Sequence, residues 1–170
     1  MKHFLFVLIS ICCITIPNVQ AQDLTTIPQT LTYINQKLNL EANKDPYEKE
    51  ASCEWSVTAD GKLIIKKFRD KKLETETSVY LKQLDTNLVE IYKEKGNPEA
   101  LGLIKIYSKE NTGITTRYLK NEHSDEKISR FYMENVSFNP DHALTNQLKK
   151  AIDRLILLAK NKKEYKEKDS

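Results

Sequence analysis

Residues 52–68 read SCEWSVTADGKLIIKKF, and this stretch decides the fold. Over residues 53–57 apolar and polar side chains alternate, which is the period-two pattern of a strand with one buried face. The dipeptide Asp60-Gly61 follows and suits a tight hairpin, because both positions tolerate positive φ. Residues 62–68 then supply the partner strand, so the stretch predicts an antiparallel β-hairpin.

The same pattern continues along the chain to about residue 138, in segments rich in β-branched and aromatic residues. Further strands are expected at residues 71–81, 84–93, 101–107, 114–119 and 128–138. The breaks between the later strands are Gly96-Asn97-Pro98, residues 110–113 and the polar residues 121–126. About seven strands with short connections and no intervening helix predict an antiparallel sheet bent into a barrel or sandwich.

An amphipathic helix is expected before the strands, over residues 26–43. Its apolar stripe has spacings of four, three and four, and consists of Ile27, Leu31, Ile34 and Leu38. Thr26 is placed to cap the helix, Pro28 is tolerated in the first turn, and Asp45-Pro46 ends the element. A helix of this length is marginal alone, so its stripe must dock on another part of the fold.

A longer amphipathic helix is expected after the strands. Asn139-Pro140-Asp141 combines an N-cap residue, a proline at the first helical position and an acidic residue near the positive end of the helix dipole. The apolar face that follows consists of Leu144, Leu148, Ala151, Ile152, Leu155, Leu158 and Ala159, with Lys149, Lys150, Asp153 and Lys160 largely opposite. This helix is expected to pack on the sheet, and residues 161–170 to form a charged, flexible tail.

The chain begins with the three regions of a cleavable secretory signal peptide. Lys2 gives a positive start, residues 4–16 are almost all apolar, and Val19-Gln20-Ala21 suits a signal peptidase. The apolar run is shorter than the about 20 residues that cross a bilayer. We expect residues 1–21 to be removed and the chain to be periplasmic or secreted, with no stable membrane anchor. A retained N-terminal anchor and a lipid-anchored form through Cys12 are the alternatives.

Residues 22–160 have a length that suits one domain with a single hydrophobic core. After cleavage the chain keeps only Cys53, so no internal disulfide is expected. Its alternation with Trp55 and Val57 favours a buried, inert thiol. The 27 basic and 24 acidic residues are interspersed along the chain, so nothing indicates a nucleic-acid partner.

The order of an N-terminal helix, about seven antiparallel strands and a C-terminal amphipathic helix resembles the pleckstrin-homology-like (PH-like) architecture. The chain is also similar to small exported bacterial proteins of uncharacterised function with that layout, on Cys53-x-Trp55, Asp60-Gly61-x-Leu63 and residues 151–158. The resemblance implies a single PH-like domain over residues 22–160, whose final helix plugs one end of a bent barrel. It implies no activity, because PH-like domains bind phosphoinositides, peptides or partner proteins, and fold alone does not choose among them.

A basic cluster around the second hairpin is one candidate site. It consists of Lys62, Lys66, Lys67, Arg69, Lys71 and Lys72. Lysines at a barrel mouth can neutralise the phosphates of a lipid headgroup. An exported protein does not normally meet phosphoinositides, however, and alternating lysines are typical of the solvated face of an exposed strand. We therefore interpret the cluster as a solvated strand face.

The sequence contains no recognisable catalytic motif. After cleavage the histidines are His123 and His142, and neither the nucleophile elbow nor the zinc-protease motif occurs. Residues 122–126, Glu-His-Ser-Asp-Glu, offer carboxylates and an imidazole to a cation, but contiguous ligands rarely converge on one ion. A solvated loop is the favoured interpretation, and we expect no catalytic residue, no cofactor and no metal site.

Aromatic residues are spread over the expected strands: Trp55, Phe68, Tyr80, Tyr92, Tyr107, Tyr118, Phe131, Tyr132 and Phe138. Most are expected in the core, and a subset facing solvent would mark a recognition surface. The sequence therefore predicts an exported, non-catalytic module that binds a protein, peptide or small ligand through the barrel or its open edge. The alternatives are a lipocalin-like carrier of a small apolar ligand, which needs an eighth strand and an unfilled lumen, and a small enzyme with a site assembled from dispersed residues.

Overall fold

The computed structural model describes residues 24–42, 51–86, 90–92, 102–109, 112–120, 123–137 and 142–162. Within them, helices α1 (Ile27–Ala42) and α2 (His142–Asn161) come before and after the strands in the sequence. The strands are β1 (Ser52–Val57), β2 (Lys62–Arg69), β3 (Lys72–Tyr80), β4 (Glu90–Tyr92), β5 (Gly102–Tyr107), β6 (Ile114–Lys120), β7 (His123–Ser129) and β8 (Phe131–Ser137). A short 3-10 helix, η2 (Leu81–Gln83), follows β3. The fold belongs to the α+β class that the sequence predicts.

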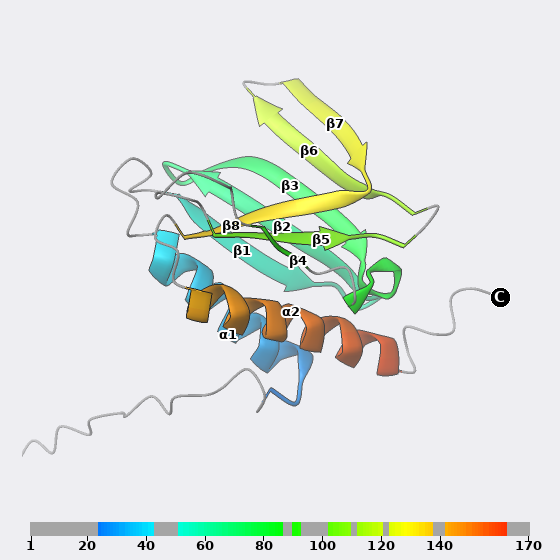
Figure 1. Cartoon of the computed structure of the whole chain (residues 1–170). Helices are drawn as coiled ribbons and strands as arrows, with labels where there is room; N and C mark the ends of the chain where they lie inside the picture. The colour runs from blue at the N-terminus through cyan, green and yellow to red at the C-terminus, as the bar shows by residue number, and fades with distance from the viewer. Residues whose placement is uncertain are drawn as a thin grey trace, which may run out of the picture.

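The described strands form two antiparallel sheets that do not close into a barrel. One sheet has the order β1-β2-β3-β6-β7 and the other the order β4-β5-β8. Only Arg130 separates β7 from β8, so the chain turns from one sheet into the other at this corner (Figure 1). The sheets also meet where Trp55 and Tyr132 pack edge to face, with ring centroids 6.3 Å apart. Of the barrel and the sandwich that the sequence left open, the described strands therefore do not form a closed barrel.

Side-chain polarity explains why the sheets stay separate beyond that contact. Residues that face each other across an antiparallel pair lie on the same face of the sheet. One row on the inner face of the larger sheet consists of Trp55, Ile65, Thr77, Thr116 and Lys127. The row begins with apolar side chains and ends with a charged one, so at this level β6 and β7 offer little apolar surface for the second sheet to bury; nearer the corner, Ile114 of β6 is buried in the core.

Strand β7 corrects one expectation from the sequence. Residues 121–126 were expected to form a loop, but His123 to Glu126 belong to β7 and pair with β6. The expected strand at 128–138 is instead divided by the bend at Arg130. The side chains of Ser124 to Ile128 are all exposed. Because these side chains of β7 are not buried on either face, the strand carries no apolar alternation that a sequence pattern can detect.

The sequence predicted a tight turn at Asp60-Gly61 with positive φ at both positions, but the structure has that geometry at the next turn. Only Gly61 of Asp60-Gly61 has a positive φ, of 84°, and it lies in a connection closed by the Thr58 N–H, which donates to the Lys62 carbonyl at 2.9 Å. The tight turn joins β2 to β3, where Asp70 and Lys71 have φ of 49° and 63°. Two successive positive values are the geometry of a type I′ turn, here without glycine.

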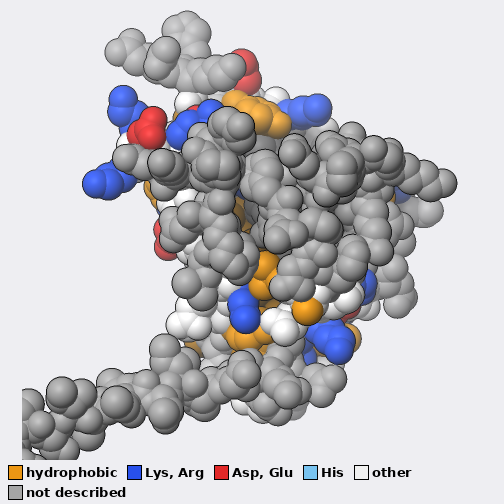
Figure 2. Space-filling model, turned by 60° about the vertical axis from the view of Figure 1, so that its left-hand side comes forward, with side chains coloured by type: hydrophobic (Ala, Val, Ile, Leu, Met, Phe, Trp, Pro, Cys, Tyr) orange, Lys and Arg blue, Asp and Glu red, His pale blue; other side chains and the backbone are white. Residues whose placement is uncertain are grey.

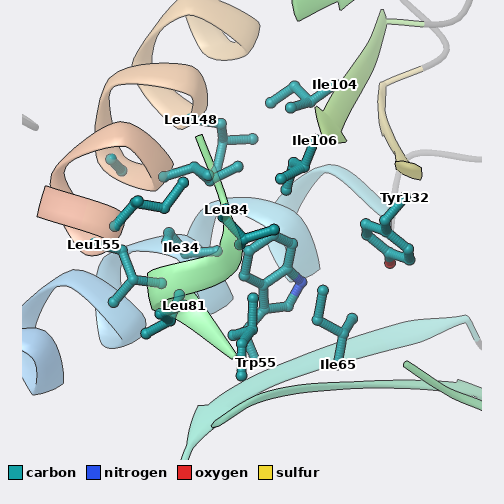
Figure 3. Close-up of a cluster of buried hydrophobic side chains, with 14 of the residues drawn as sticks. Ile34, Trp55, Ile65, Leu81, Leu84, Ile104, Ile106, Tyr132, Leu148 and Leu155 are labelled. Atoms are coloured by element: carbon teal, nitrogen blue, oxygen red, sulfur yellow. The ribbon is translucent and has the colours of Figure 1, made fainter. Parts of the chain in front are cut away.

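A single core lies between the two sheets and the helix pair (Figure 3). Its buried members come from both sheets, both helices and η2, and include Ile34, Trp55, Ile65, Leu81, Leu84, Ile104, Ile106, Tyr132, Leu148 and Leu155. Helices α1 and α2 pack against each other on one side of the sheets, where α1 contacts β1 and α2 contacts β5 (Figure 1).

The helices largely follow the expected stripes. The Gln29 N–H donates to Thr26 Oγ1 at 3.3 Å, which confirms Thr26 as the N-cap of α1. In α2 the expected stripe is buried except for Leu158, which is half-buried, while Ile156 is buried in addition. The buried arc is wider than one stripe because α2 packs on α1 as well as on the sheet.

Several expectations concern residues outside the described ranges. These are the signal peptide at 1–21, the helix stop at Asp45-Pro46, the cap at Asn139-Pro140-Asp141, and the tail from residue 163 onward. No helix in the described part of the chain has the length and apolar character needed to span a membrane.

Candidate functional site

The β6–β7 hairpin projects from the body of the fold, on the side away from the helices (Figure 1). Among the described residues, four large hydrophobic side chains are exposed: Tyr118 (41%), Ile128 (69%), Phe131 (38%) and Leu157 (43%). Three of these four lie on the hairpin or at the corner that follows it, and Leu157 lies on α2. We call residues 115–119, 124–129 and Phe131 the hairpin surface.

Strand β7 forms an edge of the larger sheet. Among the described strands it pairs with β6 alone, so its other side presents main-chain donors and acceptors. The opposite edge, β1, is covered by α1. There the side-chain amide of Asn35 bonds both main-chain groups of Trp55, and Asn39 bonds both main-chain groups of Cys53. The described part of this sheet thus has one covered edge and one open edge.

Charges alternate across the outer face of the sheet. One row runs through all five strands and consists of Glu54, Lys66, Glu76, Arg117 and Glu126. Arg117 and Glu126 form an exposed ion pair with an N–O distance of 3.8 Å. Such exposed pairs stabilise a fold only weakly, by about 0–1 kcal/mol. The row ends at Glu126, which has a basic neighbour on one side and the open edge on the other.

A hydroxyl pair attaches the hairpin to the rest of the sheet. Thr77 on β3 is buried, and its Oγ1 lies 3.0 Å from Oγ1 of Thr116 on β6. The two residues face each other in the inner row, between buried Ile65 and exposed Lys127. They mark the boundary at which the hydrophobic core gives way to the hairpin.

The base of the hairpin surface carries an aromatic pair. The rings of Tyr107 and Phe131 lie 6.1 Å apart, and the Lys105 Nζ lies 4.2 Å from the Phe131 ring centroid. A cation over an aromatic face is attracted by the ring quadrupole, which holds the ring in place. Figure 2 shows that the coloured hydrophobic side chains on one face of the molecule are interspersed with Lys and Arg.

The basic cluster considered as a headgroup site is not assembled. Lys66 lies on the outer face, whereas Lys67 lies on the inner face with its Nζ 5.2 Å from the Tyr132 ring centroid. Arg69 pairs with Glu74 at 3.5 Å. The structure thus distributes these residues over two faces, and they do not converge on one phosphate.

The residues considered for catalysis or metal binding are also separated. His123 begins β7 and His142 begins α2. Asp125 and Glu126 are adjacent on β7, so they point to opposite faces of the strand. Among the described residues, no group of three or more His, Cys, Asp or Glu is placed to hold a metal ion.

Cys53 is half-buried and packs against the core, where the sequence favoured a buried thiol. It lies on the edge strand β1, where the amide of Asn39 bonds its main chain and the core reaches only one side of the residue.

No protein-family model, no curated protein and no solved structure matches this chain. The PH-like resemblance therefore stays a prediction. The sequence predicted neither strand β7 nor which aromatic residues are exposed on the hairpin surface.

Proposed function

We propose that this chain is an exported, non-catalytic binding module that recognises a partner protein or peptide through the hairpin surface. The observation that carries the proposal is that Tyr118 on the inner face and Ile128 on the outer face are both exposed on the two strands that end at an open sheet edge, with exposed Phe131 at the corner that follows. Exposed apolar side chains beside an unpaired edge favour association with another chain, because both the apolar area and the main-chain groups gain from being covered.

The packing of the interior favours the hairpin surface, and not an internal cavity, as the binding site. Large buried side chains from both sheets, among them Trp55, Ile65 and Ile104, lie between the described strands (Figure 3). A lipocalin-like carrier needs an unfilled interior inside a closed barrel. The described part of the chain has the eighth strand that a carrier needs, but in two separate sheets, so the carrier alternative stays a prediction. Export rests on the signal-peptide pattern at residues 1–21.

The proposal can be tested by placing a photo-crosslinking amino acid in the full chain within its native host. Positions 118 and 128 lie on the hairpin surface, and position 157 on α2 is a control of comparable exposure. We expect a discrete adduct from positions 118 and 128 that is absent from position 157. Equal adducts from all three positions, or an adduct from position 157 alone, would contradict the proposal.

A further inference from the structure

We propose that the open edge of β7 binds an extended peptide segment as a sixth strand, with a basic residue opposite Glu126 and an apolar residue opposite Ile128. This inference rests on the proposed function and specifies the chemistry of the partner. Adding a strand to an exposed edge is a recurring mode of peptide recognition, in which main-chain hydrogen bonds give affinity and side chains give specificity.

The charge row on the outer face predicts the basic residue. Its signs alternate without exception from Glu54 through five strands to Glu126. Opposite charges that face each other across strands are favourable, and like charges are unfavourable. A sixth strand continues the alternation only if Lys or Arg faces Glu126. The carboxylate of Glu126 is exposed and its single close basic partner among the described ion pairs is Arg117, at 3.8 Å.

The neighbouring rows define the rest of the segment. Ile128 is exposed at the open edge, and its side chain lies over Gly113, which has no side chain to compete with it. On the inner face, Asp125 and Lys127 end their rows. Each charged residue prefers an opposite charge across from it. An antiparallel partner strand should therefore carry an apolar residue opposite Ile128, then an acidic residue opposite Lys127. Basic residues should follow opposite Glu126 and Asp125.

A second copy of the chain fits this edge less well than a peptide. Two β7 strands related by a two-fold axis perpendicular to the sheet must place one residue opposite its own copy. In the three central registers that residue is Asp125, Glu126 or Lys127, so one pair of like charges faces across the axis; in the register centred on Glu126, Asp125 also faces Lys127 on each side of the axis. No β7–β7 register places an opposite charge across from all three of Asp125, Glu126 and Lys127, whereas a segment of complementary sequence does, so the charge pattern favours such a segment.

Two ten-residue peptides test the inference against the full chain as its host produces it. The matched peptide is acetyl-Thr-Val-Thr-Val-Glu-Lys-Lys-Thr-Val-Thr, and the swapped peptide carries Lys-Glu-Glu at the three charged positions. We expect the matched peptide to bind about tenfold more tightly, because three facing charge pairs change sign together. Binding should perturb the amide resonances of residues 124–129.

Two charge reversals, one at each end of the outer-face row, distinguish binding at the open edge from attraction to the overall charge of the protein. Glu126→Lys should abolish the preference or shift it towards the swapped peptide, whereas Glu54→Lys, at the covered edge, should leave the preference intact. Both residues are exposed, so both variants should fold. If Glu126→Lys binds the swapped peptide more tightly than the unmodified chain does, the variant has gained binding, and misfolding cannot produce a gain.

Three results would overturn the inference: equal binding of the two peptides, equal effects of the two reversals, or self-association of the chain that Glu126→Lys abolishes, which would make a second copy the occupant. If crosslinks persist at positions 118 and 128 while the peptides fail to discriminate, the proposed function stands and the strand-addition inference falls. If the crosslinks at positions 118 and 128 and the preference between the peptides are both absent, the proposed function and the strand-addition inference both fall.

Discussion

The side-chain amide of Asn35 on α1 pairs with the main chain of Trp55 on β1 as a neighbouring strand would. The Trp55 N–H donates to Asn35 Oδ1 at 2.7 Å, and Asn35 Nδ2 donates to the Trp55 carbonyl at 2.9 Å. Asn39 repeats the pairing with Cys53 at 3.0 and 2.9 Å. The match is geometric, because four residues of helix rise about 6 Å and two residues of strand about 6.6 Å.

Replacing Asn35 should therefore cost more than the loss of an ordinary helix residue. Asn35→Ala leaves two main-chain groups of Trp55 without their partner, and each such group costs about 1–3 kcal/mol when buried. We expect the free energy of unfolding to fall by about 2–3 kcal/mol, although alanine favours the helix. Gln36→Ala, at an exposed neighbouring position, should change it by less than about 0.5 kcal/mol. Urea unfolding measures both, and equal effects would show that the amide pairing contributes nothing.

The turn between β2 and β3 should be improved by glycine. Lys71 has a φ of 63°, a region that costs a side chain with a Cβ roughly 1–2 kcal/mol. Lys71→Gly removes that cost in a type I′ turn, so the free energy of unfolding should rise by about 1 kcal/mol. The matched change Lys72→Gly, inside β3, should lower it. Destabilisation by Lys71→Gly would show that the turn adopts another conformation.

The hydroxyl pair that attaches the hairpin can be measured by a double-mutant cycle. Thr77→Val or Thr116→Val alone leaves one hydroxyl without its partner at the core boundary and should cost about 1 kcal/mol. The double variant should cost clearly less than the sum, with a coupling energy of about 1 kcal/mol. Amide exchange of β6 and β7 should quicken in the single variants. Additive effects would mean that water replaces the missing hydroxyl at no cost.

The sequence predicted those elements that bury one face in the core. The stripes of α1 and α2 and the alternation around Trp55 were correct, because burial imposes a period on the residues that form it. Strand β7 escaped this reasoning because its side chains are exposed, and main-chain pairing alone leaves no apolar pattern. One signal was present: Arg117 and Glu126 lie at equal distances in sequence from the centre of the hairpin and have opposite charges.

The local sequence pattern also could not predict that α1 covers the edge strand β1. Asn35 and Asn39 read as polar positions on an amphipathic helix, and their function depends on which strand edge the helix meets. That the described strands do not close into a barrel agrees with the polar end of the inner row at Thr116 and Lys127, and this row is known only once the pairing register is known. Both features are tertiary, and a single sequence does not determine them.

Asp153 on α2 gives a prediction about pH. Burial raises the pKa of its carboxyl above the ordinary value of 3.8, while the hydrogen bond and the charge of Lys149 act in the opposite direction and offset only part of the effect. Lys149 Nζ donates to Oδ2 at 2.8 Å, and Oδ1 is buried without a hydrogen-bond partner among the described residues. The carboxyl is therefore accommodated better in its protonated form than in its charged form.

Because the folded-state pKa lies above the unfolded one, the folded protein binds the proton more tightly in the window between the two values. The contribution of Asp153 is therefore fully present below pH 3.8 and is lost as the pH rises through the folded-state pKa. Asp153→Asn has no titrating group here, so its stability relative to the unmodified chain should increase over that window. Urea unfolding of both proteins at a series of pH values from below 3.8 to neutral measures the difference. Lys149→Met should raise the folded-state pKa further and extend the decline to higher pH. A relative stability of Asp153→Asn that falls with pH would instead show that the attraction of Lys149 outweighs burial.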